Sequence, residues 1–171
     1  MFQRGFDLPT RERQEGQSPV YAATGIVGYH NVAKVKGPGV VTGRSGSLGA
    51  VSFVPEDFWP LNTALWVKEF RRSTPLTAFY LLSGLDLQSF NSGAAVPTLN
   101  RNDVHGLVIP IAPLGLLQRF DDLVGPMHAL KGNLLARTTN LKQTLDLLLP
   151  KLISGELDVE HLDVETAELR A

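Results

Sequence analysis

The segment VAKVKGPGVVTGRSGSLG, residues 32–49, contains five glycines, one proline and three cations within eighteen residues. Two β-branched runs, Val32–Val35 and Val40–Thr42, flank the tripeptide Gly-Pro-Gly, which predicts two strands joined by a tight turn. A second glycine loop, residues 43–49, leads into a predicted strand at Ala50–Val54. Glycines allow a ligand to approach the backbone closely, and this loop adds cationic and hydroxyl donors. Such a loop suits an anion, and a polyanion such as DNA in particular.

Length and composition set the first limits. The 171 residues correspond to one domain, or to one domain with an appendage, and a hydrophobic fraction of 43% is sufficient for a core. The sequence contains no cysteine, which argues against disulfides and cysteine-ligated zinc. No apolar run approaches the ~18 residues of a membrane span, and the N-terminal residues lack a signal-peptide pattern. A cytoplasmic protein is therefore expected.

The net charge of -1 conceals an uneven distribution. Residues 1–112 contain ten Lys and Arg against eight Asp and Glu, whereas residues 113–171 contain six against nine. The window from Gly16 to Pro55 has no acidic residue but includes His30 and three of the cations. This window predicts a local positive field, although a chance gap in a near-neutral domain is the alternative.

The remaining N-terminal part reads as short strands, loops and one helix. Thr74 followed by Pro75 predicts a capped helix from Pro75 to about Gln88. Thr24–Asn31 reads as a turn-rich segment. The further predicted strands begin near the N-terminus and end before Pro113: around Phe2, Val20–Ala23, Leu61–Lys68 and Leu107–Ile111.

Leucine spacing dominates residues 114–153 and predicts one long helix. Apolar residues recur at spacings of three and four, with one extra four-residue step between Leu134 and Thr138. The predicted partner-facing residues are Leu123, Met127, Leu130, Leu134, Leu141, Leu145, Leu148 and Leu152. Forty helical residues span ~60 Å, so we expect this seam to require a partner helix, rather than to pack on its own domain. Gly125-Pro126 should interrupt or kink the helix, and Gly155 should end it.

Five ordered motifs carry a resemblance to a known family. They are RGFDLP at residues 4–9, GPGVVTGRSG at 37–46, DFWPLNT at 57–63, VPTLNRNDV at 96–104 and LPKLISGE at 149–156. In this order they resemble the specificity subunit of type I restriction–modification systems. The resemblance implies a DNA-recognition subunit that is not an enzyme and needs no cofactor. A full subunit has two target-recognition domains, each reading half of a split DNA site and each followed by a long spacer helix.

The resemblance implies an α+β fold. Residues 1–112 form a globular target-recognition domain with a twisted mixed β-sheet and short helices, residues 113–155 a long helix in a coiled-coil arm, and residues 156–171 an acidic tail. One domain and one helix make a half-length form, either a natural half-subunit or part of a longer chain. A homodimer through the helix is expected, with pairing to a different half as the alternative. The implied partners are double-stranded DNA, the methyltransferase (modification) subunit and the restriction subunit.

The candidate DNA-binding residues are Lys34, Lys36, Arg44, Ser45, Ser47, Tyr29, His30, Asn31, Arg71 and Arg72. The lysines, two apart on a predicted strand, should hold phosphates. Asn31 could reach adenine. Arg44 could reach guanine in the major groove, or it could form a structural salt bridge that braces its loop. Arg71 and Arg72 either touch the DNA backbone or belong to a solvated loop.

Catalytic signatures are missing from the sequence. There is no phosphate-binding P-loop motif or HExxH zinc motif, and the four histidines lack ligand spacing. An alternative function is a protein–protein assembly module that docks on the methyltransferase without reading DNA. The DNA target depends on loop geometry and cannot be predicted from the residues.

Overall fold

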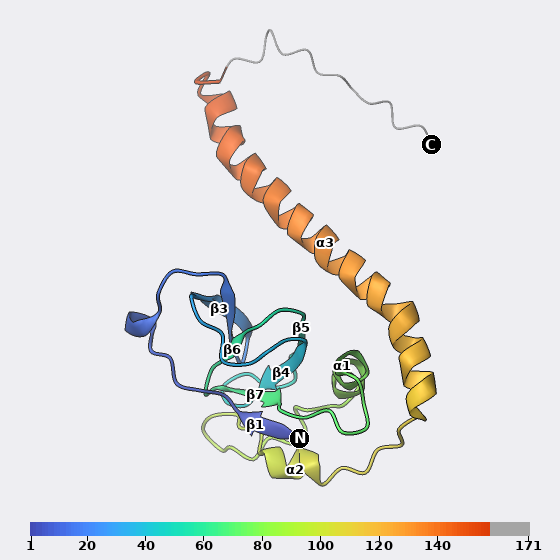
Figure 1. Cartoon of the computed structure of the whole chain (residues 1–171). Coiled ribbons are helices and arrows are strands. Elements are labelled where there is room, and N and C mark those ends of the chain that lie inside the picture. Colours follow the sequence, from blue (N-terminus) through green and yellow to red (C-terminus); the bar gives the residue numbers. More distant parts are fainter. Residues whose placement is uncertain (158–171) are drawn as a thin grey trace. The chain divides into compact units, whose positions relative to one another are not determined.

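The computed structural model describes residues 1–157, which form seven strands and four helical segments (Figure 1). In chain order these are β1 (Phe2–Arg4), the 3-10 helix η1 (Thr10–Glu12), β2 (Ser18–Ala22), β3 (Gly25–His30), β4 (Gly39–Gly43), β5 (Val51–Val54), β6 (Trp59–Pro60), β7 (Ala64–Val67), α1 (Pro75–Ser83), α2 (Arg101–His105) and α3 (Leu114–Ile153). The chain divides into unit 1, Met1–Gly125, and unit 2, which starts at Pro126. The predicted acidic tail lies almost entirely outside the described residues.

Unit 1 contains two small sheets. The four-stranded sheet has the order β1-β7-β4-β5 and is antiparallel throughout. The three-stranded sheet has the order β3-β2-β6, in which β2 pairs antiparallel with β3 and parallel with β6. The α+β class and the long C-terminal helix are confirmed, whereas the coiled-coil arm stays a prediction.

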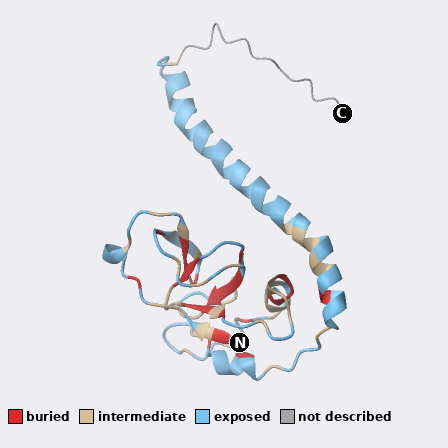
Figure 2. Cartoon of the chain, in the orientation of Figure 1, coloured by how far each residue is buried: buried red, intermediate tan, exposed pale blue. Residues whose placement is uncertain are grey.

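The main core lies between the four-stranded sheet and the segments that cover it, where α1 packs on β4 and β5 and α2 packs beside β1 (Figure 2). Its buried residues are Phe2, Val40, Leu65, Val67, Ala78, Leu87, Leu99 and Val104. Burying this much aliphatic and aromatic surface is the main source of stability for a unit of this size.

Helix α1 begins as the sequence predicts. Thr74 accepts a hydrogen bond from the Thr77 backbone N–H (3.1 Å), and Pro75 occupies the first helical position. The helix ends at Ser83, earlier than expected, and Gly84 follows as the C-cap. The Thr74 hydroxyl also donates to Asp121 of α3 (2.9 Å), so the cap of α1 holds the first turns of α3 within unit 1.

Helix α3 is continuous from Leu114 to Ile153, with Pro126 and Pro150 inside it. The predicted interruption at Gly125-Pro126 is therefore absent, while the predicted end is confirmed by Gly155, whose φ is +73°. Within the described residues, no helix has the uninterrupted apolar length that a bilayer crossing demands. Our domain limits at residues 112 and 155 stay predictions.

Three local predictions are wrong. Val32–Val35 is not a strand, since Val35 makes only an isolated bridge with Phe58. Leu107–Ile111 is irregular, because Pro110 lacks a ladder N–H and the Val108 side chain is fully in solvent. The segment Gly25–His30, read as turns, is strand β3.

Candidate nucleic-acid interface

The predicted DNA-binding residues fall into three separate groups in the structure. Lys34 and Lys36 precede strand β4, whereas Arg44, Ser45 and Ser47 follow it. The five residues of β4 place roughly 16 Å of extended chain between these groups. Arg71 and Arg72 form the third group, just before the cap of α1.

The first group is called the Trp59 surface here. It comprises Tyr29, Asn31, Lys34 and Lys36, all of them exposed, and Lys34 lies over the Trp59 ring. The Lys34 ammonium lies 5.2 Å from the centre of the Trp59 ring. Trp59 is itself buried, as expected for a core aromatic residue, and therefore supports the surface from below. A cation held over an indole face is favourably placed to meet a phosphate, because its aliphatic stem is already ordered.

His30 is part of the framework beneath the Trp59 surface. It is 7% exposed, its ring meets Trp59 edge to face at 5.3 Å, and its Nδ1 accepts a hydrogen bond from the Gln14 backbone N–H (3.0 Å). The side chain of Asn31 donates to Gln14 Oε1 (2.7 Å). His30 is therefore a framework residue, because it is buried and its Nδ1 holds the loop at Gln14 against β3.

Folding changes the electrostatics of the acid-free window. The Gly37 N–H donates to Asp57 Oδ1 (2.9 Å), which brings the Glu56-Asp57 turn beside Lys36. Tyr21 lies nearby in the core, and its pKa is raised to about 12 by burial first, then by the negative charge of Glu56. The predicted positive field near Lys36 is thus partly offset by carboxylates that are distant in sequence.

The second group is a junction between four of the motifs. The Arg44 guanidinium donates to the Asn62 carbonyl (3.0 Å), and the Arg44 backbone N–H donates to the Thr63 carbonyl (2.8 Å). The Leu99 N–H donates to the Arg44 carbonyl (2.8 Å), and the Asn62 side chain donates to Asp7. Arg44 therefore braces the loop, as the alternative reading of this residue predicted, although through a carbonyl and not through an ion pair.

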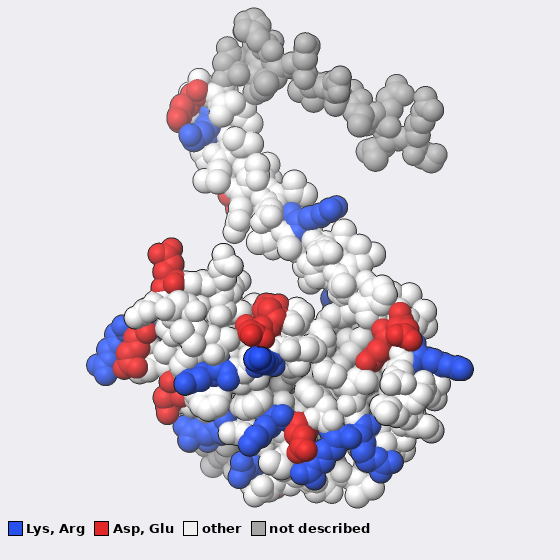
Figure 3. All heavy atoms as spheres, in the orientation of Figure 1, with Lys and Arg blue, Asp and Glu red and all other residues white. Residues whose placement is uncertain are grey.

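Two arginines that the sequence analysis missed lie beside Arg44. Arg4, Arg44 and Arg101 line one cavity of about 470 Å³. Arg4 follows the buried Phe2 by two positions, and Arg101 follows the buried Leu99 by two positions. Both arginines lie inside a motif. This two-residue spacing could have indicated that both arginines lie at the edge of the core, because residues i and i+2 of an extended chain share a face. Lys and Arg gather over this part of unit 1, near β1 and α2, with few Asp and Glu (Figure 3).

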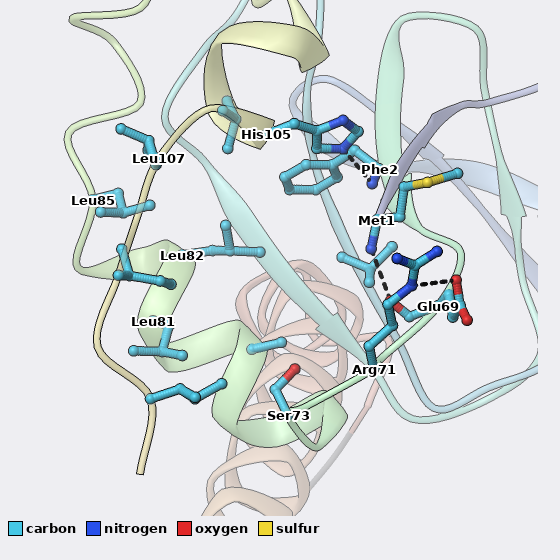
Figure 4. A pocket seen from close by; sticks show the side chains of 15 residues that line it. Met1, Phe2, Glu69, Arg71, Ser73, Leu81, Leu82, Leu85, His105 and Leu107 are labelled. Carbon is cyan, nitrogen blue, oxygen red and sulfur yellow. Dashed lines mark hydrogen bonds and ion pairs between the residues drawn. The ribbon is translucent and has the colours of Figure 1, made fainter.

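The third group is partly neutralised. Arg71 forms an exposed ion pair with Glu69 (3.0 Å) at the rim of an apolar cavity of about 240 Å³ (Figure 4). In the same region the Phe2 backbone N–H donates to His105 Nε2 (2.8 Å), which ties α2 to β1. Burial lowers the pKa of His105, with smaller contributions from the N-terminal amine and Arg101. Arg72 is exposed and has no ion pair within the described residues, whereas Arg71 is held by Glu69.

Comparisons with known proteins agree with the resemblance drawn from the motifs. No family model matches the chain. The chain is 40% identical over 70 residues to the type I restriction enzyme MjaIX specificity subunit of Methanocaldococcus jannaschii, a match covering 41% of this chain and 16% of that protein. Its fold matches the crystal structure of a type I restriction–modification S subunit from M. genitalium with a TM-score of 0.72 and 15% identity, over 90% of this chain and 43% of the other.

These matches differ in what they show. The chain spans well under two thirds of either protein, so the similarity is to a part of each. At 15% identity the crystal structure shows the fold alone. The predicted resemblance is confirmed: in sequence over 70 residues this chain is similar to one type I specificity subunit, and in fold it is similar to part of another.

Proposed function

We propose that the chain is the DNA sequence-recognition subunit of a type I restriction–modification complex in the cytoplasm. It is non-enzymatic, binds one half of a split DNA site, and scaffolds the methyltransferase and restriction subunits. The observation that carries this proposal is the 40% identity over 70 residues with a curated specificity subunit. The shared fold and the basic region of unit 1 support it (Figure 3).

Unit 1 supplies the DNA contacts in this proposal. Tyr29 and Asn31 stand exposed at the end of β3, where an amide side chain can pair with an adenine edge. Lys34 and Lys36 hold backbone phosphates, which sets the register of the domain on the duplex without reading sequence. In this proposal Tyr29 and Asn31 therefore contact bases, whereas Lys34 and Lys36 contact phosphates.

Helix α3 supplies the contact to a second copy of the chain. The eight predicted partner-facing residues, from Leu123 to Leu152, are between 40% and 70% exposed. An unpaired apolar stripe of this length is costly in water, and a two-fold dimer buries it on both helices at once. The paired helices would then set the distance between two half-sites.

The test is DNA binding by the chain assembled with its methyltransferase, measured over a salt series. The double substitution Lys34→Gln/Lys36→Gln should weaken binding and make its salt dependence shallower, because one or two phosphate contacts are lost. Lys131→Gln/Lys142→Gln removes the same charge from α3 and should leave DNA affinity unchanged. Absence of DNA binding by the unsubstituted assembly at low salt would reject the function.

A second candidate function is an assembly module that docks on the methyltransferase without reading DNA. The exposed leucine stripe of α3 is the observation that favours it. Under this alternative, the Lys34/Lys36 variant binds DNA as well as the unsubstituted assembly does. Under the primary proposal, DNA affinity falls while the dimer mass stays intact.

A further inference from the structure

Three arginines line one cavity at the edge of the main core. Arg4, Arg44 and Arg101 line a space of about 470 Å³, together with Ser92, Thr98 and Asn100. Arg4 and Arg101 are exposed, so the cavity opens to solvent. None of the candidate DNA contacts inferred from sequence, apart from Arg44, belongs to it.

Strand pairing explains why the first two arginines meet. Arg4 of β1 pairs with Leu65 of β7, and Leu65 pairs on its other side with Thr42 of β4. Arg44 follows Thr42 by two residues and therefore continues the same face of the chain. This is the face that Phe2, Val40 and Leu65 bury, so both arginines stand where the core meets solvent.

The third arginine, Arg101, belongs to the segment around Leu99 that covers that face. The Leu99 N–H donates to the Arg44 carbonyl (2.8 Å), which fixes the covering segment against the β4 end. Arg101 then begins α2, two residues after the buried Leu99. Three segments that are far apart in sequence thus bring one cation each to a shared space.

The cavity offers donors and almost no negative charge. Aspartate and glutamate are missing from its wall, and within residues 1–157 none of the three arginines has a carboxylate at ion-pair distance. Arg44 uses one N–H on the Asn62 carbonyl, whereas a guanidinium has five. The hydroxyls of Ser92 and Thr98 already donate to backbone carbonyls. The unused donors are therefore mainly guanidinium N–H groups, which match an oxyanion in a bidentate manner.

We propose that this cavity binds a phosphodiester group of the DNA backbone, as an anchor that carries no sequence information. The inference rests on the proposed function and adds Arg4 and Arg101 to the interface. Like charges gathered in one cavity repel each other, and a phosphate relieves that repulsion by accepting hydrogen bonds from several guanidinium groups. DNA presents such groups at regular intervals, and most protein contacts to DNA go to them or to the sugars.

The experiment measures binding of a random-sequence duplex over a salt series, so that the unknown target is not needed. The variant is Arg4→Gln/Arg101→Gln, with Arg101→Gln alone as the milder form. Arg44 is left in place because it braces the loop. Arg119→Gln, at an exposed position of α3 within unit 1, is the control for loss of positive charge. The double variant should bind more weakly and lose about one unit of the slope of log affinity against log salt.

Inorganic phosphate, tested separately, distinguishes a DNA anchor from a small-molecule site. If the unsubstituted chain binds DNA and the double variant keeps the same slope, the cavity assignment is overturned while the proposed function stands. If neither the unsubstituted chain nor its assembly with the methyltransferase binds DNA at low salt, the proposed function fails and the DNA assignment fails with it. Binding of inorganic phosphate by such a chain, lost in the double variant, would identify a free-oxyanion site instead.

Discussion

Arg44 braces the fold and is at the same time a candidate DNA contact. Its guanidinium satisfies the Asn62 carbonyl, and its backbone links β4 to two other motif segments. We expect Arg44→Gln to lower the free energy of unfolding by roughly 1–3 kcal/mol, because a partly buried carbonyl loses its donor. Urea denaturation measures this, with Arg119→Gln as the control. Unchanged stability combined with weaker DNA binding would show that Arg44 reads DNA and does not brace the loop.

Tyr21 should make stability fall at high pH. Burial raises its pKa in the folded state to about 12 from an ordinary value of 10.0, so the folded state holds the phenolic proton more tightly than the unfolded state. Its contribution is complete below pH 10.0 and is lost as the pH rises toward 12. Denaturation midpoints measured across this range should decline less in Tyr21→Phe than in the unsubstituted chain. An equal decline in both proteins would assign the pH dependence to other groups.

Single residues were predicted from sequence with uneven success. The Thr74 cap was predicted because capping depends on adjacent residues only. The burial of His30 was not predicted, because it depends on contacts with Gln14 and Trp59 that form only through tertiary packing. The arginine cavity was missed for the same reason, because its three members come from β1, the end of β4 and the start of α2.

Among the elements, α1 and α3 were predicted from sequence, whereas η1, α2 and strand β3 were missed. Strand β3 contains Gly25 and Gly28, both with positive φ, and pairs with β2 across a register shift. Local sequence signals read those glycines as turns, whereas pairing with β2 makes the segment a strand. The α3 segment was predicted closely, because the 3-4 spacing from Leu123 to Leu152 is a local signal that does not depend on tertiary contacts.

The exposed leucine stripe of helix α3 leads to a prediction about self-association. We expect Leu134→Lys to weaken self-association about a hundredfold or more, because the dimer loses two buried leucines at roughly 1.5–3 kcal/mol each. Gln143→Lys adds the same charge half a turn around the helix and should leave association unchanged. Sedimentation over a concentration series measures both variants. Equal behaviour of the two variants would place the contact elsewhere on the helix.

At the scale of the whole molecule, the two units draw stability from different sources. Unit 1 has its own buried core, whereas the described residues from Pro126 to Glu156 have no buried side chain. An isolated helix without tertiary packing is only marginally stable in water. We therefore expect hydrogen-exchange protection of residues 126–153 to fall on dilution, while peptides from β4 and β7 stay protected. Protection that does not change with concentration, in a chain with the mass of a monomer, would contradict pairing through α3.

The motifs gave more information about the whole chain than about any one site. Their order predicted the α+β fold and the resemblance to a specificity subunit, because both follow from many residues in sequence. The site could be predicted only in part, since Asp7, Arg44, Asn62 and Leu99 meet through hydrogen bonds between distant segments. In this chain the motifs build a junction around Arg44, and most of the candidate DNA contacts, such as Lys34 and Lys36, lie in separate groups.

The period of the leucine stripe has a consequence for how two such helices would lie together. From Leu123 to Leu152 the stripe, with Thr138 filling the position between Leu134 and Leu141, advances 29 residues in eight steps. This is about 3.6 residues per turn and equals the period of an undistorted α-helix. A strict seven-residue repeat would force a left-handed superhelix. This stripe instead runs parallel to the helix axis, so two copies can meet along a straight line of contact with little winding about each other.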